Sequence, residues 1–335
     1  MSAVCCDIHA HFIPPSLVED LRAGTALDGM QLEDRDGQPW VTHRQGPKYP
    51  LQPELHDTEA RLALMDRMGI DLALVSLSPT LLFYWLEPSE AADWARRAND
   101  DIAALVAEGG GRIEGIAQLP MQDADAAIAE ARRAKDELGF KGVQLAPMIL
   151  DRTLDDDDFF PVLEELDRLG LPMMLHPYFV GAGDRPGLDK YFMTNLAGHP
   201  YSTAIGASRL ILSGALDRLP DLAPVLVHGG GYLPYQIGRL DHGNEVRPEA
   251  KVCEQRPSAY LRRFVFDTLT HSPAALRYLI DLVGIDRVAY GTDFPYDMGG
   301  WSAQAQLEGV GLDADAFERI SGRNGLELFG LSAPS

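Results

Sequence analysis

The hydrophobic residues of this chain fall into short continuous runs that alternate with longer stretches of helical spacing. Eight runs are rich in aliphatic residues, and most are apolar on both faces, as is typical of strands buried in a parallel sheet. They cover residues 4–8, 71–77, 112–119, 142–146, 173–176, 225–228, 264–267 and 287–290. Helical spacing is found at 59–68, 89–107, 124–138, 160–169, 203–217 and 273–282. This alternation predicts an α/β fold in which residues 1–335 form one (β/α)8 TIM barrel rather than two doubly wound domains.

Two of the predicted helices begin at residues that can cap them. Asp57 precedes the segment Thr-Glu-Ala-Arg-Leu, and Ser272 precedes Pro273 and two alanines. The side chains of Asp and Ser accept hydrogen bonds from first-turn N–H groups, and proline fits the first helical position. We therefore predict helix N-caps at Asp57 and Ser272.

Residues 12–56 form a long insertion after the first predicted strand, where a barrel usually has a short loop. Within it, the turn dipeptide Asp36-Gly37 is flanked by residues that favour strands, which predicts a small hairpin. An insertion at the carboxyl end of a barrel strand lies over the face that carries active sites. We interpret the segment as a lid-like flap, and a flexible excursion without a role in function is the alternative.

Composition and charge exclude several classes of partner. Fifty acidic residues against 29 basic ones give a formal charge of −21, the wrong sign for neutralising the phosphates of a nucleic acid. Three cysteines cannot build a disulfide framework, and the first residues lack the basic and apolar regions of an export signal. No segment reaches the roughly 20 apolar residues of a membrane-spanning helix. We expect a cytoplasmic globular protein.

Polar side chains gather where several predicted strands end. His9 and His11 sit at the end of the first strand, two residues apart, so alternation along the strand points both to one face. The fifth strand ends at His176, the sixth ends at His228, and Asp293 follows the eighth. One histidine on an apolar strand is commonly a core residue, but five such groups at one rim of a barrel indicate a site for a borderline divalent ion.

The same positions favour one metal ion over two. A second ion would need a bridging group, commonly a modified lysine after the fourth strand, and the chain has Gln144 there. We predict one divalent ion whose ligands are His9, His11, His176 and Asp293. His228 is then the neighbouring acid or base, and Asp293 belongs to both the metal site and the catalytic site. Imidazole and carboxylate ligands accept zinc, manganese, iron or cobalt.

Several motifs of this sequence extend over nearly its whole length. They are D-I-H-A-H-F at the start, L-H-P, H-G-G-G followed by G-R-L-D, L-I-L-S-G-A-L-D-R-L-P, G-T-D-F-P and the closing R-N-G-L-E-L-F-G. With these motifs the sequence resembles the amidohydrolase superfamily, in particular the branch typified by 2-amino-3-carboxymuconate-6-semialdehyde decarboxylase. The resemblance implies a metal-dependent enzyme that removes a carboxyl group, without O2, from a small unsaturated or aromatic acid. It also implies zinc as the ion, with manganese possible, and a homodimer.

The resemblance assigns roles to individual residues. The four predicted ligands match the zinc ligands of the family, and His228 matches its catalytic histidine. A metal ion lowers the pKa of bound water towards about 7, so that a neutral histidine beside it can accept a proton. Arg239 matches an arginine that holds a substrate carboxylate, for which a planar guanidinium is suited.

Other predicted substrate contacts depart from the family pattern. Where the family has an arginine in the insertion, this chain has Tyr49 with Lys48 beside it, and a lysine cannot bind a carboxylate through two parallel hydrogen bonds. Tyr191 stands where the family has a tryptophan. Phe294 is a further candidate contact. The aromatic residues Trp40, Phe83, Trp85 and Tyr178 either line the pocket or belong to the core.

The remaining histidines and glycines have simpler interpretations. His199, His242 and His271 lack metal spacing, and we interpret them as surface or capping residues. His43 and His56 lie on or beside the insertion, where a structural role is the simplest interpretation. Residues 229–231 are three glycines without the spacing of a dinucleotide site, which indicates a close approach of the backbone beside the metal.

Two other functions are compatible with these residues. A metal-bound water could hydrolyse a lactone or an amide or hydrate a conjugated acid, so a hydrolase or hydratase is the alternative enzyme. A metal ion could also stabilise the barrel without catalysis. A structural site should be closed by four protein ligands, whereas a catalytic site keeps a position open.

Overall fold

A computed structural model describes residues 4–24, 27, 29–43, 48–178 and 187–334. Eight parallel strands form one sheet in the order β1-β5-β6-β7-β10-β11-β12-β13. The strands are β1 (Cys6–Phe12), β5 (Leu72–Leu77), β6 (Ile113–Gln118), β7 (Gly142–Leu145), β10 (Met173–Leu175), β11 (Pro224–Leu226), β12 (Val265–Asp267) and β13 (Val288–Ala289). Each of the eight predicted runs contains or overlaps one of these strands. The prediction of an α/β barrel is therefore confirmed.

The first and last parts of the sheet meet, so that the barrel is nearly closed. The Ile8 N–H donates to the Tyr290 carbonyl at 3.0 Å, and the His11 N–H donates to the Phe294 carbonyl at 2.8 Å. The first strand is longer than predicted, because its pairing with β5 continues to Phe12. His9 and His11 lie in the second half of this strand, near the predicted strand end.

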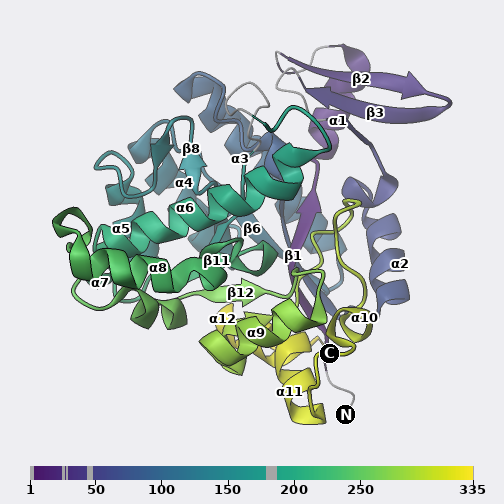
Figure 1. Cartoon of the computed structure of the whole chain (residues 1–335). Helices are drawn as coiled ribbons and strands as arrows, with labels where there is room; N and C mark the ends of the chain where they lie inside the picture. The colour runs from purple at the N-terminus through teal and green to yellow at the C-terminus, as the bar shows by residue number, and fades with distance from the viewer. Residues whose placement is uncertain (1–3, 25–26, 28, 44–47, 179–186, 335) are drawn as a thin grey trace.

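Helices surround the barrel (Figure 1). Those between the barrel strands are α2 (Thr58–Met68), α3 (Pro88–Glu108), α4 (Ala124–Asp136), α5 (Phe160–Leu169), α6 (His199–Leu212), α7 (Ala215–Arg218), α8 (Leu233–Val246) and α9 (Pro273–Val283). The shorter α10 (Ala303–Leu307), α11 (Ala314–Glu318) and α12 (Asn324–Leu328) follow β13. The predicted caps are confirmed: the Asp57 carboxylate accepts from the Ala60 N–H, and the Ser272 hydroxyl accepts from the Ala275 N–H.

Two helical predictions need correction. The predicted helix 203–217 is two helices, because Gly214 adopts a left-handed φ of 73° between α6 and α7. Helix α8 was not predicted, because its glycines at 238 and 243 interrupt the apolar spacing and resemble a loop signal.

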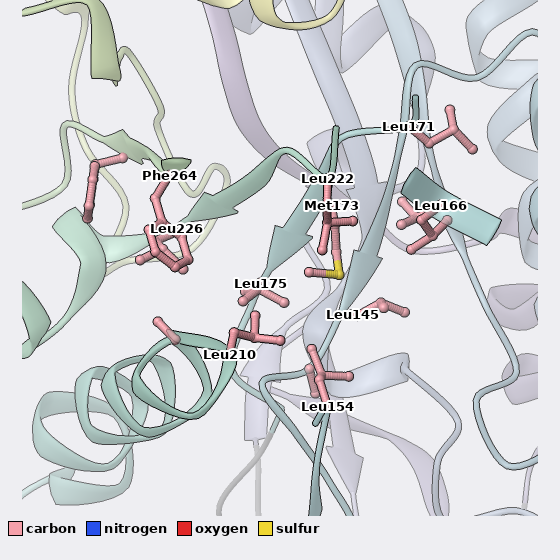
Figure 2. Close-up of a cluster of buried hydrophobic side chains, with 14 of the residues drawn as sticks. Leu145, Leu154, Leu166, Leu171, Met173, Leu175, Leu210, Leu222, Leu226 and Phe264 are labelled. Atoms are coloured by element: carbon pink, nitrogen blue, oxygen red, sulfur yellow. The ribbon is translucent and has the colours of Figure 1, made fainter. Parts of the chain in front are cut away.

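The core lies between the barrel wall and the surrounding helices. Figure 2 shows part of it, in which leucines and a methionine from neighbouring strands pack with side chains from α5 and α6. Leu145, Met173, Leu175 and Leu226 come from β7, β10 and β11, and all four are fully buried. Burying such a side chain contributes about 1.5–3 kcal/mol each. This core holds the strand ends in fixed positions, and the functional side chains project from those ends.

The described part of the insertion is folded. It contains α1 (Pro15–Ala23), β2 (Met30–Arg35), β3 (Gln38–His43) and β4 (Lys48–Pro50), and residues 25, 26, 28 and 44–47 lie outside the described residues. Strands β2 and β3 pair antiparallel around Asp36 and Gly37, which confirms the predicted hairpin. Figure 1 shows the hairpin standing away from the barrel at the upper right. The buried side chains of Leu17, Val18 and Val41 join the insertion to the barrel through a second apolar cluster.

Within the described residues, no helix combines the length and the apolar character needed to cross a membrane.

Candidate metal centre

The four predicted ligands come together at the carboxyl end of the barrel. His9 and His11 lie on β1, His176 follows β10, and Asp293 follows β13. All four are buried, and one possible ligand atom from each lies within 4.8 Å of those of the other three. Residues that are up to 284 positions apart in the sequence therefore share one small site, as their places at strand ends predict.

The four possible ligand atoms of this group face one another, and two of them have no hydrogen-bond partner among the described residues. His9 Nε2 lies 3.1 Å from His11 Nε2, and Asp293 Oδ1 lies 2.9 Å from His11 Nε2 and 3.8 Å from His176 Nε2. Among the described residues, His176 Nε2 and Asp293 Oδ1 have no hydrogen-bond partner, although both atoms are buried. Buried polar atoms are normally satisfied. Three imidazole nitrogens and a carboxylate oxygen directed at one point fit a single divalent ion.

Asp267 at the end of β12 orients the first of these ligands. Its Oδ2 accepts from His9 Nδ1–H at 2.9 Å and from the His228 N–H at 2.9 Å. Its Oδ1 accepts from the N–H groups of Gly229 and Leu269 at 2.7 and 3.1 Å. Because Nδ1 of His9 is thereby held as a donor, Nε2 presents its lone pair to the site. Sequence reasoning missed Asp267, although it is the only carboxylate that ends a predicted strand.

The other two histidines are oriented in the same way. The Ser76 hydroxyl donates to Gln144 Oε1 at 2.6 Å and so accepts from His11 Nδ1–H at 3.2 Å. His176 Nδ1 donates to the Pro177 carbonyl at 3.0 Å. Gln144, which replaces the lysine of a two-metal site, thus supports a ligand of the single site.

Asp7 joins the strand that carries His9 to the loop that carries Asp293. Its carboxylate accepts from the Thr292 hydroxyl at 2.6 Å, and from the N–H groups of Thr292 and His9, each at 3.0 Å. Burial raises the pKa of Asp7 to about 6, although these hydrogen bonds oppose the shift. Asp293 and His228 both have left-handed φ angles, 56° and 55°, which non-glycine residues rarely adopt. Such strain persists only where the surrounding contacts impose it.

The protonation states suit a metal site. Burial lowers the pKa of His11 to about 4 and the pKa of His176 well below its usual value. Burial also disfavours a charge on Asp293, but the three histidines that face the carboxylate, His11, His176 and His228, hold its pKa well below normal. Neutral imidazoles and an ionised carboxylate are the forms that bind metal ions. His9 differs: burial lowers its pKa, but the hydrogen bond to Asp267 and nearby negative charges outweigh burial and raise it.

His228 lies beside the four ligands without belonging to their group. It follows β11, and its Nε2 is 3.4 Å from Asp293 Oδ2. Its ring centroid is 5.2 Å from that of His176 and 5.6 Å from that of His9. This position suits proton exchange with a molecule bound at the metal site.

The three glycines after His228 allow the backbone to pass very close to its neighbours, as predicted. A Cβ atom on Gly229 would lie 2.7 Å from Thr270 Cγ2, and one on Gly231 would lie 2.2 Å from the Pro200 carbonyl oxygen. All three glycines have left-handed φ angles. Only glycine fits here, and the fit fixes the loop of His228 against its surroundings.

Two cavities adjoin the site. The first has a volume of about 340 Å³, and its wall includes His176, His228, Asp293, Lys48, Tyr49 and Trp40. The Tyr49 hydroxyl lies 2.8 Å from the Thr80 hydroxyl, and burial raises the pKa of Tyr49. The second cavity, of about 650 Å³, also reaches His228 and Asp293. The metal site is therefore open to a ligand.

Three predicted substrate contacts do not lie on the first cavity. Arg239 is on the exposed face of α8, because the helix buries Leu233 and Ile237 against the barrel and turns residue 239 outward. Arg239 lines neither of the two cavities of a single chain, and its role in holding a substrate stays a prediction.

Tyr191 and Phe294 do not line the first cavity, but residues one or two positions further along the chain do. Tyr191 is 86% exposed, and the next residue, Phe192, lines the cavity instead. Phe294 lies outside the cavity wall, to which Pro295 and Tyr296 contribute. Its backbone is engaged in closing the barrel with His11, which directs the following residues to the cavity.

The other aromatic candidates divide between cavity and core. Trp40 lines the first cavity. Phe83, Trp85 and Tyr178 do not line either cavity, and their rings pack against one another, with centroids 5.8 Å apart for Phe83 and Trp85 and 6.4 Å apart for Trp85 and Tyr178.

The prediction that His199 is a surface or capping residue is wrong. It lines both cavities, its Nε2 is buried, and burial, followed by the charge of His228, lowers its pKa to about 4. His271 lines the second cavity, and His242 is exposed as predicted. His43 is buried edge-on against Trp85. The sequence around His199 shows no strand end and no metal spacing, so no local signal marks it.

Comparisons with known proteins identify the family of this chain. The amidohydrolase family model matches residues 6–331. The chain is 31% identical to 2-amino-3-carboxymuconate-6-semialdehyde decarboxylase of Dictyostelium discoideum, over 97% of this chain and 91% of that protein. The crystal structure of 5-carboxyvanillate decarboxylase from Sphingomonas paucimobilis superimposes with a TM-score of 0.83 and 27% identity, covering 99% of this chain and 100% of that one.

A further solved structure contains a metal ion. It is a dihydroxybenzoic acid decarboxylase from Polaromonas with bound manganese and the inhibitor 2-nitroresorcinol. The TM-score is 0.81 at 27% identity, covering 98% of this chain and 97% of that one.

Proposed function

We infer the activity of this chain from its membership of the amidohydrolase family, to which it belongs over residues 6–331. The chain is a metal-dependent carboxy-lyase that removes a carboxyl group, without an oxidant, from a small aromatic or unsaturated acid. The observation that carries this proposal is the group of four buried donor atoms within 4.8 Å, with His228 and an open cavity beside it. The relatives described above, which extend over nearly the whole chain, are named as decarboxylases.

The residues of the site have distinct roles in this proposal. His9, His11, His176 and Asp293 hold one divalent ion, which supplies a Lewis acid when bound. His228 exchanges a proton with the substrate, since its ring adjoins the ligands and faces the cavity. Lys48 brings a positive charge to the cavity wall, and Tyr49 brings a hydroxyl group. Of the predicted substrate contacts, Lys48 and Tyr49 are the two that line the first cavity.

An assay of carbon dioxide release tests the proposal. Purified protein is reconstituted with a divalent metal and incubated with a panel of hydroxybenzoic and unsaturated acids, together with lactone and amide analogues. We expect carbon dioxide and a product that has gained no water, and no activity from His176→Ala. Water addition without carbon dioxide would instead support a hydrolase or hydratase. Stoichiometric metal without any turnover would support a structural metal.

We propose zinc as the resident ion, on the resemblance to the zinc enzymes of this branch. Manganese is the competing ion, because the related dihydroxybenzoic acid decarboxylase contains it. Metal analysis of protein purified without added metal, followed by reconstitution with each ion, tests the choice. Higher activity with manganese than with zinc at full occupancy would overturn it.

We also propose a cytoplasmic homodimer. The described cysteines, Cys5, Cys6 and Cys253, are free thiols, which suits a reducing compartment. The outer face of α8 carries Arg239 and a Tyr235 that is 78% exposed, so a second copy can cover it. Sedimentation at micromolar concentration should give twice the chain mass. A monomer would contradict the dimer and leave Arg239 without a substrate role.

A further inference from the structure

His199 stands at the boundary between the two cavities, next to His228. It is the first residue of α6 and follows a single π-helical turn, η3 (Thr194–Gly198). The rings of His199 and His228 are nearly parallel, 15° apart, with centroids separated by 6.5 Å. Both residues line both cavities. The close approach of Gly231 to the Pro200 carbonyl fixes the loop of His228 against the first turn of α6.

The neighbouring Asn195 determines which nitrogen of His199 carries the proton. The Asn195 amide nitrogen Nδ2 lies 3.4 Å from His199 Nδ1, and an amide nitrogen can only donate. Nδ1 of His199 is then the acceptor, and a neutral imidazole must carry its proton on Nε2. The ring is neutral because burial lowers the pKa of His199 to about 4.

The contact with Asp293 determines which nitrogen of His228 carries the proton. His228 Nε2 faces Asp293 Oδ2 at 3.4 Å, and a carboxylate that holds a metal ion is ionised and can only accept. Nε2 of a neutral His228 therefore carries the proton, and Nδ1 has the lone pair. Two buried atoms remain without a hydrogen-bond partner among the described residues: His199 Nε2, a donor, and His228 Nδ1, an acceptor.

We propose that His199 is a positioning residue that donates from Nε2–H to Nδ1 of His228, directly or through one water molecule. The hydrogen bonds then run in one direction, from Asn195 to His199, from His199 to His228 and from His228 to Asp293. This direction keeps the proton of His228 on the nitrogen that faces the metal centre. It also satisfies two buried polar groups, which destabilise the fold when they are left unpaired.

Nuclear magnetic resonance of the imidazole nitrogens tests the inference without any assay of activity. The zinc-loaded protein is labelled with 15N-histidine, and the signals of His228 are identified by their loss in His228→Asn. We expect the wild-type ring of His228 to be in the Nε2–H tautomer. His199→Leu should produce a mixture of tautomers. An unchanged Nε2–H tautomer in folded, metal-loaded His199→Leu would overturn the inference.

Two amide variants separate positioning from packing. The amide nitrogen of glutamine can reach the place of Nε2, whereas that of asparagine reaches only the place of Nδ1. His199→Gln should therefore keep the tautomer of His228, and His199→Asn should lose it, with the same thermal stability in both. Equal behaviour of the two variants would overturn the role of Nε2–H. Glu164→Gln, at an exposed position of α5 away from both cavities, is the control and should change nothing.

A kinetic measurement extends the test and rests on the proposed function. In the decarboxylase assay, His199→Leu and His199→Asn should lower kcat about tenfold or more, because general acid–base catalysis depends on the position of the proton. KM and metal content should not change. If no acid of the panel is decarboxylated, the proposed function fails while the tautomer result still decides this inference. If kcat is unchanged although the tautomer shifts, the positioning role in catalysis is wrong.

Discussion

At the scale of single residues, Asp267 shows that a metal centre depends on residues that are not themselves ligands. Its two oxygens accept four hydrogen bonds, from His9 Nδ1 and from three backbone N–H groups. Asp267→Asn replaces one acceptor oxygen by an NH2 group, which cannot accept from either partner on that side. We expect metal affinity to fall about 10–100-fold. Competition with a chromophoric chelator measures it.

The control for this prediction is Asp281→Asn. Asp281 lies on α9, its side chain is 64% exposed, and it pairs only with the neighbouring Arg277 among the described residues. Its replacement should leave metal affinity at the wild-type value. An Asp267→Asn protein that binds metal as tightly as wild type would show that the orientation of His9 does not depend on the carboxylate.

The same scale shows which functional residues a sequence can reveal. His9, His11, His176, His228 and Asp293 could be predicted because each stands at or near the end of an apolar strand. His199 could not be predicted, because it is placed at the site by the packing of α6 against the loop of glycines 229–231. This packing leaves no pattern in the sequence around His199. Tyr191 and Phe294 do not line the first cavity, whereas residues one or two positions further along the chain do, since the path of a loop decides which side chain enters a cavity.

At the scale of elements, the β2–β3 hairpin depends on its turn. Asp36 and Gly37 both have positive φ angles, 54° and 85°, and a Cβ on Gly37 would contact nothing within 4 Å. Gly37→Ala therefore costs only backbone strain, about 1–2 kcal/mol. Because β3 carries Trp40 and pairs with β4, which carries Lys48 and Tyr49, we expect KM to rise while metal content stays constant.

Gly238→Ala on α8 is the matched control for the hairpin. Gly238 lies inside a helix, and its Cβ would also contact nothing within 4 Å. Alanine favours a helix over glycine by about 0.8–1 kcal/mol, so this variant should melt at the wild-type temperature or above it. A Gly37→Ala protein with unchanged KM would show that the hairpin does not shape the substrate site, and the lid interpretation would lose its support.

Helices α4 and α5 are joined by an ion pair that makes stability depend on pH. Glu165 is buried, and hydrogen bonds from Arg168 and from Arg132, the latter at 2.7 Å, lower its pKa from 4.5 to about 2. A lowered pKa stabilises the fold above the unfolded pKa, and this contribution disappears as pH falls from about 5 to 2. Glu165→Gln should cost about 1–3 kcal/mol near neutral pH and progressively less in acid.

Urea unfolding of wild type and variant at successive pH values measures this difference, down to the lowest pH at which both unfold cooperatively. Glu164→Gln is the control, because Glu164 is 57% exposed and lies 3.8 Å from its nearest cation, on Arg218. Its effect should be small at every pH. A cost of Glu165→Gln that does not change between pH 7 and pH 3 would contradict the role of the charge.

The elements themselves were largely predictable, for a physical reason. Strands buried on both faces are mostly apolar, so each of the eight barrel strands left a largely apolar run in the sequence. The first strand was predicted too short, because polar ligands occupy its second half and interrupt the run. Gly214 divided one predicted helix in two, since a left-handed glycine inside a helical pattern gives no sign of its φ angle.

At the scale of the whole molecule, the metal centre ties distant parts of the barrel together. Its ligands come from β1 and from the segments that follow β10 and β13, which are first, fifth and eighth in the sheet. Without an ion, four donor atoms within 4.8 Å present lone pairs to one another. An ion that binds only the folded chain stabilises it by about 2.7 kcal/mol at a concentration of 100 Kd. Chelation should therefore lower the Tm of the wild-type protein, and added metal should restore it.

The decisive comparison for this coupling is His176→Ala, which removes the only ligand contributed by β10. We expect chelator and metal to leave its Tm unchanged, because three remaining donors cannot close the site, whereas the exposed Glu164→Gln should respond like wild type. Differential scanning calorimetry with measured metal content gives both values. If His176→Ala keeps the full metal-dependent rise in Tm, the ion binds elsewhere on the chain. The convergence of β1, β10 and the segment after β13 would then have another cause, and the proposed catalysis at this rim would fall with it.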